Sequence, residues 1–299
     1  MEPKTQLVLE EELISWSGHR WFRIGVLLIM ILDVVAWAYI LSGKKIEHSE
    51  LYFLNVGQGD SSLALLPGGV KVLIDGGPMN GVLQKNLETI LPIQDRYVDV
   101  VAMTHPQQDH YGGFLELFRN YKIGIFITSG YDSTNDSWKE LQKIIAERKI
   151  PTLVLDEMDI ISYGDTYFRI LSPRPGEKVK DVNDASLVMR FEESGVRALF
   201  TGDISAKKEK ELTRRFNIDV DILKISHHGS KYSSDPVFLK EASPLVSIVE
   251  VGKNSYGHPT QQTLNRLADI GTQIYRTDQD SILKVVLADQ QIQIFKTQY

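Results

Sequence analysis

The sequence predicts an α/β fold in which two sheets form the core and helices cover them, preceded by one N-terminal transmembrane helix. Strand-like runs come first in a series and then alternate with helical segments, and this order occurs twice along the chain, which favours a two-sheet core. With 42% hydrophobic residues among 299, the chain is able to bury a large core. No linker-like segment divides residues 49–299, so we expect one domain there.

The predicted membrane anchor is residues 24–41, an 18-residue apolar stretch with one charge, Asp33. At about 1.5 Å per helical residue it reaches about 27 Å, close to the thickness of the hydrocarbon core of a bilayer. A buried core helix and a cleaved signal peptide are the alternatives. We expect residues 1–23 to be a short polar segment, residues 24–41 to be a retained single-pass anchor in the cell membrane, and the domain at 49–299 to be extracytoplasmic. Lys and Arg are balanced around the span, so they do not fix its orientation.

The first series of elements covers the segment up to residue 149. Three strand-like runs are separated by glycine turns, and a helix, a buried strand and an amphipathic helix follow. The expected strands are 50–56, 61–67, 70–77 and 97–105, and the expected helices are 81–91 and 136–149.

The second series repeats this order after residue 165. Its alternating runs predict strands at 166–172, 185–192, 196–203, 219–228 and 244–252 and a closing hairpin at 282–295. Helical spacing predicts helices at 205–216 and 259–271.

Composition excludes two kinds of site. The chain has no cysteine, so it has neither disulfides nor thiolate zinc ligands. Its formal net charge is −6, which argues against non-specific binding to a nucleic-acid backbone. The basic helix at 205–216 is more simply interpreted as a solvated face.

Polar side chains gather where strand-like runs end. Groups just past the ends of neighbouring strands converge at one sheet edge, where loops build sites on a rigid scaffold. Taken singly, each residue has an ordinary interpretation as turn chemistry or a structural histidine. Together they fit a metal site: His105, Asp109, His110, Asp203, His227, His228 and His258, with Asp75 placed to orient a ligand imidazole.

Seven motifs in this order carry a family resemblance: "FLNVGQGDSS", "LIDGG", "THPQQDHYGG", "NDASL", "LFTGD", "KISHHGSKYSS" and "NSYGHPT", within residues 53–260. The set resembles the metallo-β-lactamase-fold hydrolases and, among them, looks most like the hydrolase domain of ComEC-type competence proteins. The resemblance implies a four-layer αββα sandwich with a metal site at one edge of the two sheets.

The motifs depart from the superfamily pattern at two positions. Gln107 stands where the metal loop usually has its second His, and Asn183 and Asp184 stand near the position of a third-motif His. The resemblance then implies one firm metal position, with these ligands: Asp109, His110, Asp203 and one of His227 and His228. A second, weaker position keeps His105 and the shared Asp203, with help from Gln107 or Asp184. Oxygen-rich ligation favours Mn²⁺ or Mg²⁺, with Zn²⁺ possible.

The predicted function is a membrane-anchored, metal-dependent phosphodiesterase or nuclease that uses a metal-bound hydroxide. Asp109, His258 and His227 are the predicted catalytic residues, and Lys231 either holds a phosphate or belongs to a solvated loop. The substrate would be DNA or a cell-surface phosphodiester polymer. Two alternatives stay open: a hydrolase of another ester, lactone or lactam bond, and a catalytically weakened, membrane-tethered binding module.

Overall fold

The structure is a computed structural model that describes residues 11–41, 46–288 and 291–297. The chain divides into two units, Met1–Lys45 and Ile46–Tyr299. Helix α1 (Glu11–Leu41) belongs to the first unit, and its large apolar side chains from Leu27 to Trp37 are exposed. Within the described part of the chain, no helix combines the length and the apolar character that a membrane span requires. Part of the expected polar segment, residues 1–10, lies outside the described residues.

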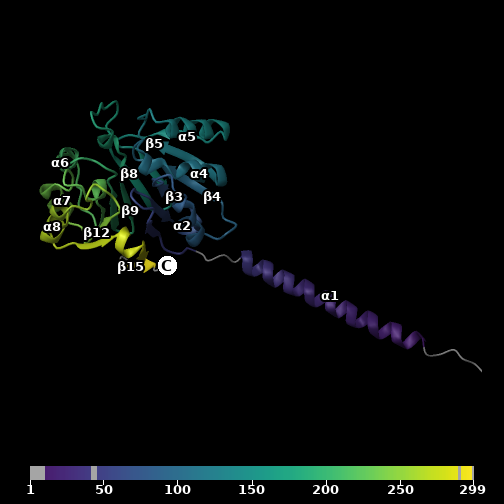
Figure 1. Cartoon of the computed structure of the whole chain (residues 1–299). Helices are drawn as coiled ribbons and strands as arrows, with labels where there is room; N and C mark the ends of the chain where they lie inside the picture. The colour runs from purple at the N-terminus through teal and green to yellow at the C-terminus, as the bar shows by residue number, and fades with distance from the viewer. Residues whose placement is uncertain (1–10, 42–45, 289–290, 298–299) are drawn as a thin grey trace, which may run out of the picture. The chain divides into compact units, whose positions relative to one another are not determined.

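The second unit contains two sheets (Figure 1). In the described residues one sheet has eight strands, in this order: β15 (Gln291–Thr297), β14 (Ile282–Ala288), β1 (Glu50–Phe53), β2 (Ser62–Leu65), β3 (Lys71–Ile74), β4 (Tyr97–Ala102), β5 (Lys122–Thr128) and β6 (Thr152–Val154). The other has seven, in this order: β13 (Gln273–Arg276), β12 (Val246–Val249), β11 (Ile222–Lys224), β10 (Val196–Phe200), β9 (Val188–Glu193), β8 (Thr166–Ser172) and β7 (Ile160–Tyr163).

Helices cover the outer face of each sheet, so the unit has four layers. One outer layer holds α2 (Val82–Ile90), α4 (Phe114–Asn120) and α5 (Asp136–Glu147). The other holds α6 (Ala206–Arg215), α7 (Pro236–Ala242) and α8 (Gln261–Asp269). Three hydrophobic cores fill the spaces between the layers. Because side chains alternate along a strand, Leu51 and Phe53 of β1 enter the core between the sheets, whereas Tyr52 faces the helices.

The parallel strands bring the polar motifs to one edge. Strands β3 to β6 are parallel in the first sheet, and β10 to β13 are parallel in the second. Asp75 follows β3, the short helix α3 (Gln108–Tyr111) follows β4, and Asp203 follows β10. The two-sheet α/β architecture expected from the sequence is therefore confirmed, and its strand ends carry the candidate site.

Several elements were not anticipated from the sequence. No element was expected over 114–128, where α4 and β5 form, and none at β6, β7, α7, β13 or α9 (Thr277–Asp280). The strand expected at 219–228 is confined to β11, Ile222–Lys224, because the chain turns after it into a 3₁₀ turn at Ser226–Gly229. These are short segments, for which local periodicity is a weak signal.

Candidate metal centre

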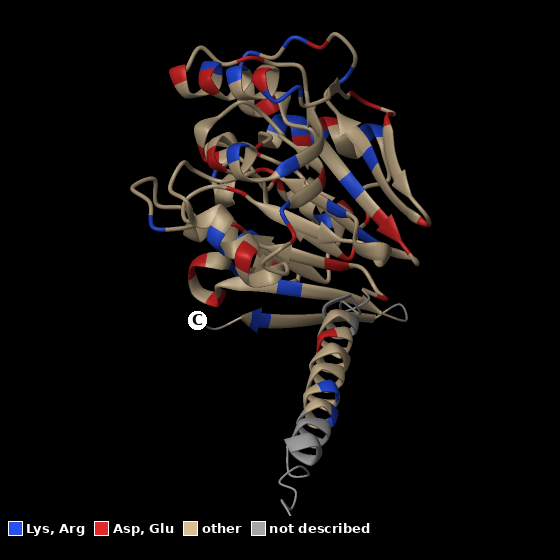
Figure 2. Ribbon diagram, turned by 90° about the vertical axis from the view of Figure 1, so that its right-hand side faces the viewer, with Lys and Arg blue, Asp and Glu red and all other residues tan. Residues whose placement is uncertain are grey.

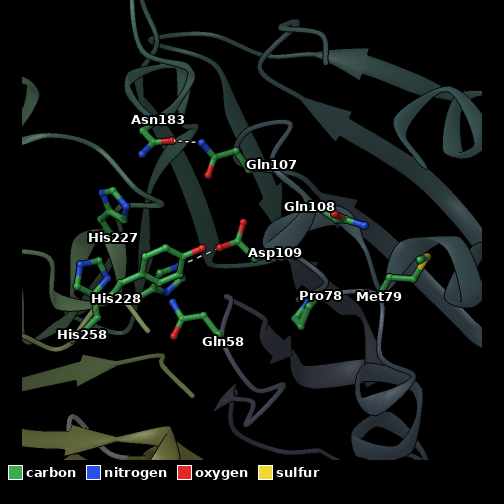
Figure 3. Close-up of a pocket in the computed structure, with 11 residues that line it drawn as sticks. Gln58, Pro78, Met79, Gln107, Gln108, Asp109, Asn183, His227, His228 and His258 are labelled. Carbon is green, nitrogen blue, oxygen red and sulfur yellow. Dashed lines mark hydrogen bonds and ion pairs between the residues drawn. The ribbon is translucent and has the colours of Figure 1, made fainter. Parts of the chain in front are cut away.

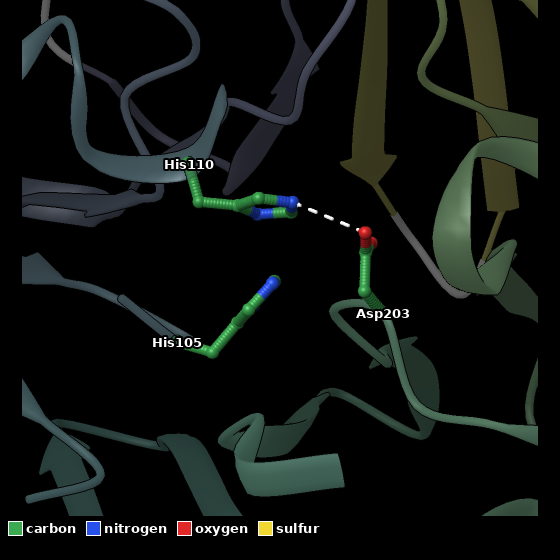
Figure 4. A group of neighbouring side chains, drawn as sticks. All are labelled: His105, His110 and Asp203. Atoms are coloured by element: carbon green, nitrogen blue, oxygen red, sulfur yellow. Dashed lines mark ion pairs between the residues drawn. The ribbon is translucent and has the colours of Figure 1, made fainter. Parts of the chain in front are cut away.

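Asp203 lies at the centre of the polar cluster. Its Oδ2 is 3.3 Å from Nε2 of His110 and 3.5 Å from Nε2 of His228. The same nitrogen of His228 is 3.5 Å from Oδ2 of Asp109. His105 stacks obliquely on His110, with ring centroids 4.1 Å apart. Figure 4 shows His105, His110 and Asp203 pointing toward a common space.

The donor atoms of this cluster fit a divalent metal. Of the buried atoms without a hydrogen-bond partner among the described residues, four belong to the side chains around this centre: Nε2 of His105, His110 and His228, and Oδ1 of Asp203. Burying such atoms unpaired is costly, so their convergence indicates that a cation completes the site. Two sets of predicted ligands have ligand atoms within 4.8 Å of one another: Asp109, His110 and His228, and His105, His110 and Asp203. His110, predicted for the firm position alone, belongs to both sets.

The structure distinguishes the two adjacent histidines. His228 is 2% exposed and borders both Asp109 and Asp203, whereas the side chain of His227 is 30% exposed and its Nε2 is 4.0 Å from Asp203. Both residues adopt left-handed backbone angles, with φ of 52° and 51°. Non-glycine residues held there store strain of about 1–3 kcal/mol each, typical of functional sites. The turn thus directs His228 into the centre and leaves His227 on the pocket wall.

Asp75 holds a ligand imidazole from behind. Its Oδ2 is 2.9 Å from Nδ1 of His110 and also accepts a hydrogen bond from the Thr104 hydroxyl at 2.7 Å. The backbone N–H of Thr104 donates to the other carboxylate oxygen. With Nδ1 of His110 held by Asp75, Nε2 is free to face the centre, which is how such outer carboxylates support metal ligands.

Gln107 and Asn183 contact each other beside the centre. The amide nitrogen of Gln107 donates a hydrogen bond to Oδ1 of Asn183, and both residues line the pocket. Asp184 takes a different role, because its Oδ1 accepts the backbone N–H of Ser205 before α6. Of the two residues Asn183 and Asp184, it is therefore the amide of Asn183, and not the carboxylate of Asp184, that lines the pocket.

Sequence reasoning missed a buried charge network behind the ligands. The ammonium group of Lys224 forms an ion pair with Asp60, donates to the Gly202 carbonyl at 3.1 Å, and lies 3.9 Å from Asp203. Asp60 Oδ1 is also 3.0 Å from Nδ1 of His228. A signal was present in the sequence, since Lys224 is one charge within the apolar run "ILKI".

The electrostatics of the cluster follow from burial and opposite charges. Burial by itself would raise the pKa of Asp203, but the neighbouring imidazoles of His228 and His110 hold it well below its ordinary value. Burial by itself would lower the pKa of His228, yet Asp203 and Asp60 raise it to about 10. Burial and the neighbouring His110 lower the pKa of His105 to about 3, so His105 is a neutral donor at neutral pH.

Glu209 of α6 clamps the loop that carries both histidines, residues 226–235, hereafter the His loop. Its carboxylate accepts hydrogen bonds from the Ser226 hydroxyl at 2.8 Å, the Ser234 N–H at 2.9 Å and the Asp235 N–H at 2.7 Å. One fully buried group therefore joins the beginning of the His loop to its end, and so fixes the turn at His227 and His228.

A cavity of about 600 Å³ opens beside the centre (Figure 3). Of two further predicted site residues, His258 and Lys231, one lines the cavity and the other does not. His258 lines the cavity and its ring centroid is 5.6 Å from that of His227, whereas Lys231 is exposed on the His loop and is not among the lining residues. The lining residues are these: Gln58, Pro78, Met79, Gln107, Gln108, Asp109, Asn183, His227, His228, Tyr256 and His258.

Comparison with known proteins identifies the class. A model of the metallo-beta-lactamase superfamily matches residues 54–252, and the chain belongs to this superfamily, whose members are generally metal-dependent hydrolases. Two solved structures share the fold at low identity. They are the metallo-beta-lactamase fold protein YhfI of Bacillus subtilis (12% identity, TM-score 0.54, 79% of this chain and 99% of that one) and the metallo hydrolase Igni18 of Ignicoccus hospitalis (12%, 0.51, 79% and 98%).

Within the superfamily, the curated relatives include ComEC-type competence proteins, which confirms the resemblance carried by the motifs. ComE operon protein 3 of Bacillus subtilis is 30% identical over 260 residues, 80% of this chain and 33% of that protein. Competence protein ComA of Neisseria gonorrhoeae is 29% identical over 63% of this chain and 25% of that protein. The chain thus spans a third or less of the length of these relatives.

Proposed function

We propose that this chain is a metal-dependent phosphodiesterase that acts on a nucleic-acid strand. The observation that carries the proposal is the convergence of three unpartnered imidazole nitrogens and two carboxylates beside an open cavity. The curated relatives of this chain include Competence protein ComA and Recombination protein 2, and both competence and recombination involve DNA.

The residues that would hold the metal are those that converge on Asp203. Asp109, His110, His228 and Asp203 supply the firm position, and His105 with Asp203 supplies the second. A divalent ion bound there would lower the pKa of a water and offset the charge of a phosphodiester. The mixed carboxylate and imidazole donors suit Mn²⁺ or Mg²⁺ as well as Zn²⁺.

Two histidines on the pocket wall remain for proton transfer. His227 and His258 both line the cavity, and neither belongs to the buried donor sets. Burial and the neighbouring His227 lower the pKa of His258. A neutral imidazole suits the acceptance of a proton or the donation of a hydrogen bond to a leaving oxygen.

The distribution of surface charge favours recognition of a phosphodiester strand at the metal centre over its binding in a basic groove. Figure 2 shows acidic and basic residues interspersed over the elements of the second unit. The chain is acidic overall, with a formal charge of −6. A phosphodiester strand would therefore gain its electrostatic attraction mainly from the metal centre, because non-specific backbone binding requires an excess of Lys and Arg.

We further propose that residues 24–41 hold the domain at the cell membrane, with residues 49–299 outside the cytoplasm. The exposed apolar side chains of α1 between Ile24 and Trp37 support an apolar environment for this helix. Fractionation of cells that express the full chain tests the proposal. The chain should stay with membranes after a carbonate wash, and release by carbonate would contradict the anchor. Protease added to intact cells or spheroplasts should cleave the domain, and protection would contradict the orientation.

Hydrolysis assays test the activity on the full chain with Mn²⁺, Mg²⁺ or Zn²⁺ added. We expect metal-dependent cleavage of bis-p-nitrophenyl phosphate and of single-stranded DNA, with little cleavage of a chromogenic cephalosporin. The variant Asp203→Asn is the control, because it keeps the shape of the side chain but removes its charge. Turnover that persists in Asp203→Asn, or turnover of the cephalosporin alone, would contradict the proposal. Absence of turnover with every metal would favour a binding module.

A further inference from the structure

Tyr256 stands exposed on the wall of the cavity. Its side chain is 70% exposed, although an aromatic ring ordinarily gains free energy from burial. It lines the cavity, and its ring centroid is 5.8 Å from that of His258. Rings then continue inward, because His258 is 5.6 Å from His227 and His227 is 6.1 Å from His228. A series of rings therefore leads from Tyr256 to the metal centre.

The loop that carries Tyr256 is built around one side chain, Asn254. Its amide nitrogen donates to the carbonyls of Gly252 and His258, each at 2.8 Å. Its Oδ1 accepts the backbone N–H groups of Tyr256 at 3.1 Å and His258 at 3.0 Å. These four hydrogen bonds fix the loop from the inside, so the backbone that carries the exposed ring is held in place. A rigid support is what a binding side chain requires.

Apart from Asp109 and the histidines, the cavity wall is uncharged, and besides Pro78, Met79 and Tyr256 it consists of amide side chains. Within the described residues the lining includes neither Lys nor Arg, and it includes four amide side chains: Gln58, Gln107, Gln108 and Asn183. Amides both donate and accept hydrogen bonds, which suits the edges of nucleobases. Away from the metal centre, the cavity therefore offers stacking and hydrogen bonding in place of phosphate-binding cations.

We propose that Tyr256 is the platform on which the base next to the cleaved phosphodiester stacks. This inference rests on the proposed phosphodiesterase function and adds to it that the substrate is recognised through a base. Stacking on an aromatic side chain accepts any base, because every base has a π-face, so the site would select a base-bearing strand without selecting a sequence. Base stacking also requires an unpaired base, which makes a single strand the substrate.

The test compares two 12-mers in the presence of Mn²⁺: oligothymidylate, and a strand of the same length in which every residue is abasic. For the full wild-type chain we expect a kcat/KM about 5- to 100-fold higher on the strand with bases, the range typical of one stacked base. Tyr256→Ala and Tyr256→Leu should erase this preference, and Tyr256→Phe should keep it. Because the side chain is exposed, we expect each variant to melt at the wild-type temperature.

Tyr232 provides the matched control. It is also 70% exposed and is carried by the His loop, but it is not among the residues that line the cavity. Tyr232→Ala should therefore keep the wild-type preference. Two outcomes would overturn the stacking role: equal rates of the wild type on the two 12-mers, or an unchanged preference in Tyr256→Ala. Hydrolysis of bis-p-nitrophenyl phosphate in the same experiment would show that the phosphodiesterase function still stands. A wild-type chain that hydrolyses no phosphodiester with any metal would overturn both.

Discussion

Gln107 donates a hydrogen bond from its side-chain amide to Oδ1 of Asn183, which lies 76 positions later in the chain. This contact joins the metal loop to the turn that precedes β9, and both residues face the cavity. The amide nitrogen of Gln107 is thereby bound to a neutral group, and a neutral amide oxygen is a weaker metal ligand than imidazole or carboxylate. This pair supports the proposal that the metal position beside His105 is the weaker of the two.

Replacement of Gln107 by His should strengthen that second position. Gln107→His adds an imidazole on the loop that already carries His105 and His110, and imidazole favours Zn²⁺. We expect zinc bound per chain, measured by elemental analysis after gel filtration, to rise from one firmly bound ion toward two. Gln108→His is the matched control, because Gln108 also lines the cavity but does not stand at the motif position. An equal zinc content in the two variants would contradict the role given to residue 107.

The two adjacent histidines should separate clearly in metal binding. His228→Gln removes a buried donor that borders Asp109 and Asp203, so metal affinity should fall by at least about 100-fold, since groups that only orient ligands already contribute 10–100-fold. His227→Gln alters a residue on the cavity wall and should lower metal affinity less than tenfold. Titration against a chelator of known affinity measures the metal affinity of each variant. A loss in His227→Gln as large as in His228→Gln would show that the turn presents the other imidazole.

The buried ion pair of Lys224 and Asp60 should be costly to break from one side. Lys224→Met removes the ammonium group that faces the buried Asp60 carboxylate, and removal of one partner of a buried ion pair typically costs about 3–5 kcal/mol of unfolding free energy. The double variant Lys224→Met with Asp60→Leu should recover most of this loss in urea unfolding. Lys139→Met, which breaks an exposed ion pair with Asp136, is the control and should change stability little. Equal losses in the single and double variants would contradict the pairing.

The same lysine should influence how strongly metal stabilises the fold. Because its charge offsets Asp60 and Asp203, its removal leaves more negative charge for a divalent ion to neutralise. We expect Mn²⁺ to raise the melting temperature of Lys224→Met by more than it raises that of the wild type. A smaller rise would indicate that Lys224 organises the ligands more than it offsets their charge.

Glu209 should make stability depend on pH. Burial raises its pKa from 4.5 to about 7, despite the three hydrogen bonds that it accepts. The folded state therefore holds the proton more tightly than the unfolded state does, so the stability from this group is full below pH 4.5 and is lost as the pH rises to about 7. The loss should be about 3 kcal/mol, and Glu209→Gln should remove it. Urea unfolding of the wild type and of Glu209→Gln at pH 5 and pH 8 measures how the unfolding free energy of each depends on pH. An equal loss of stability in the two proteins would contradict the role of Glu209.

The sequence by itself determined the order of the elements and the chemistry at their ends. Apolar or alternating runs such as "ELYF" and "VRALF" predicted strands, and the order of strands and helices predicted a two-sheet core with helices outside. His105, His110 and Asp203 were predictable because each follows an apolar run, and the ends of parallel strands meet at one edge. Chain order and local period suffice for such inferences.

Only the tertiary structure decided which of these groups meet. The pairing of Asp60 with Lys224 joins residues 164 positions apart and depends on how the two sheets lie against each other. The selection of His228 over His227 depends on two left-handed residues in a turn that Glu209 holds from another element. Local propensity disfavours that turn, so it exists only because long-range hydrogen bonds and packing offset its strain. The kinds of candidate metal ligand can thus be predicted from the sequence. Their convergence arises from contacts between distant parts of the chain.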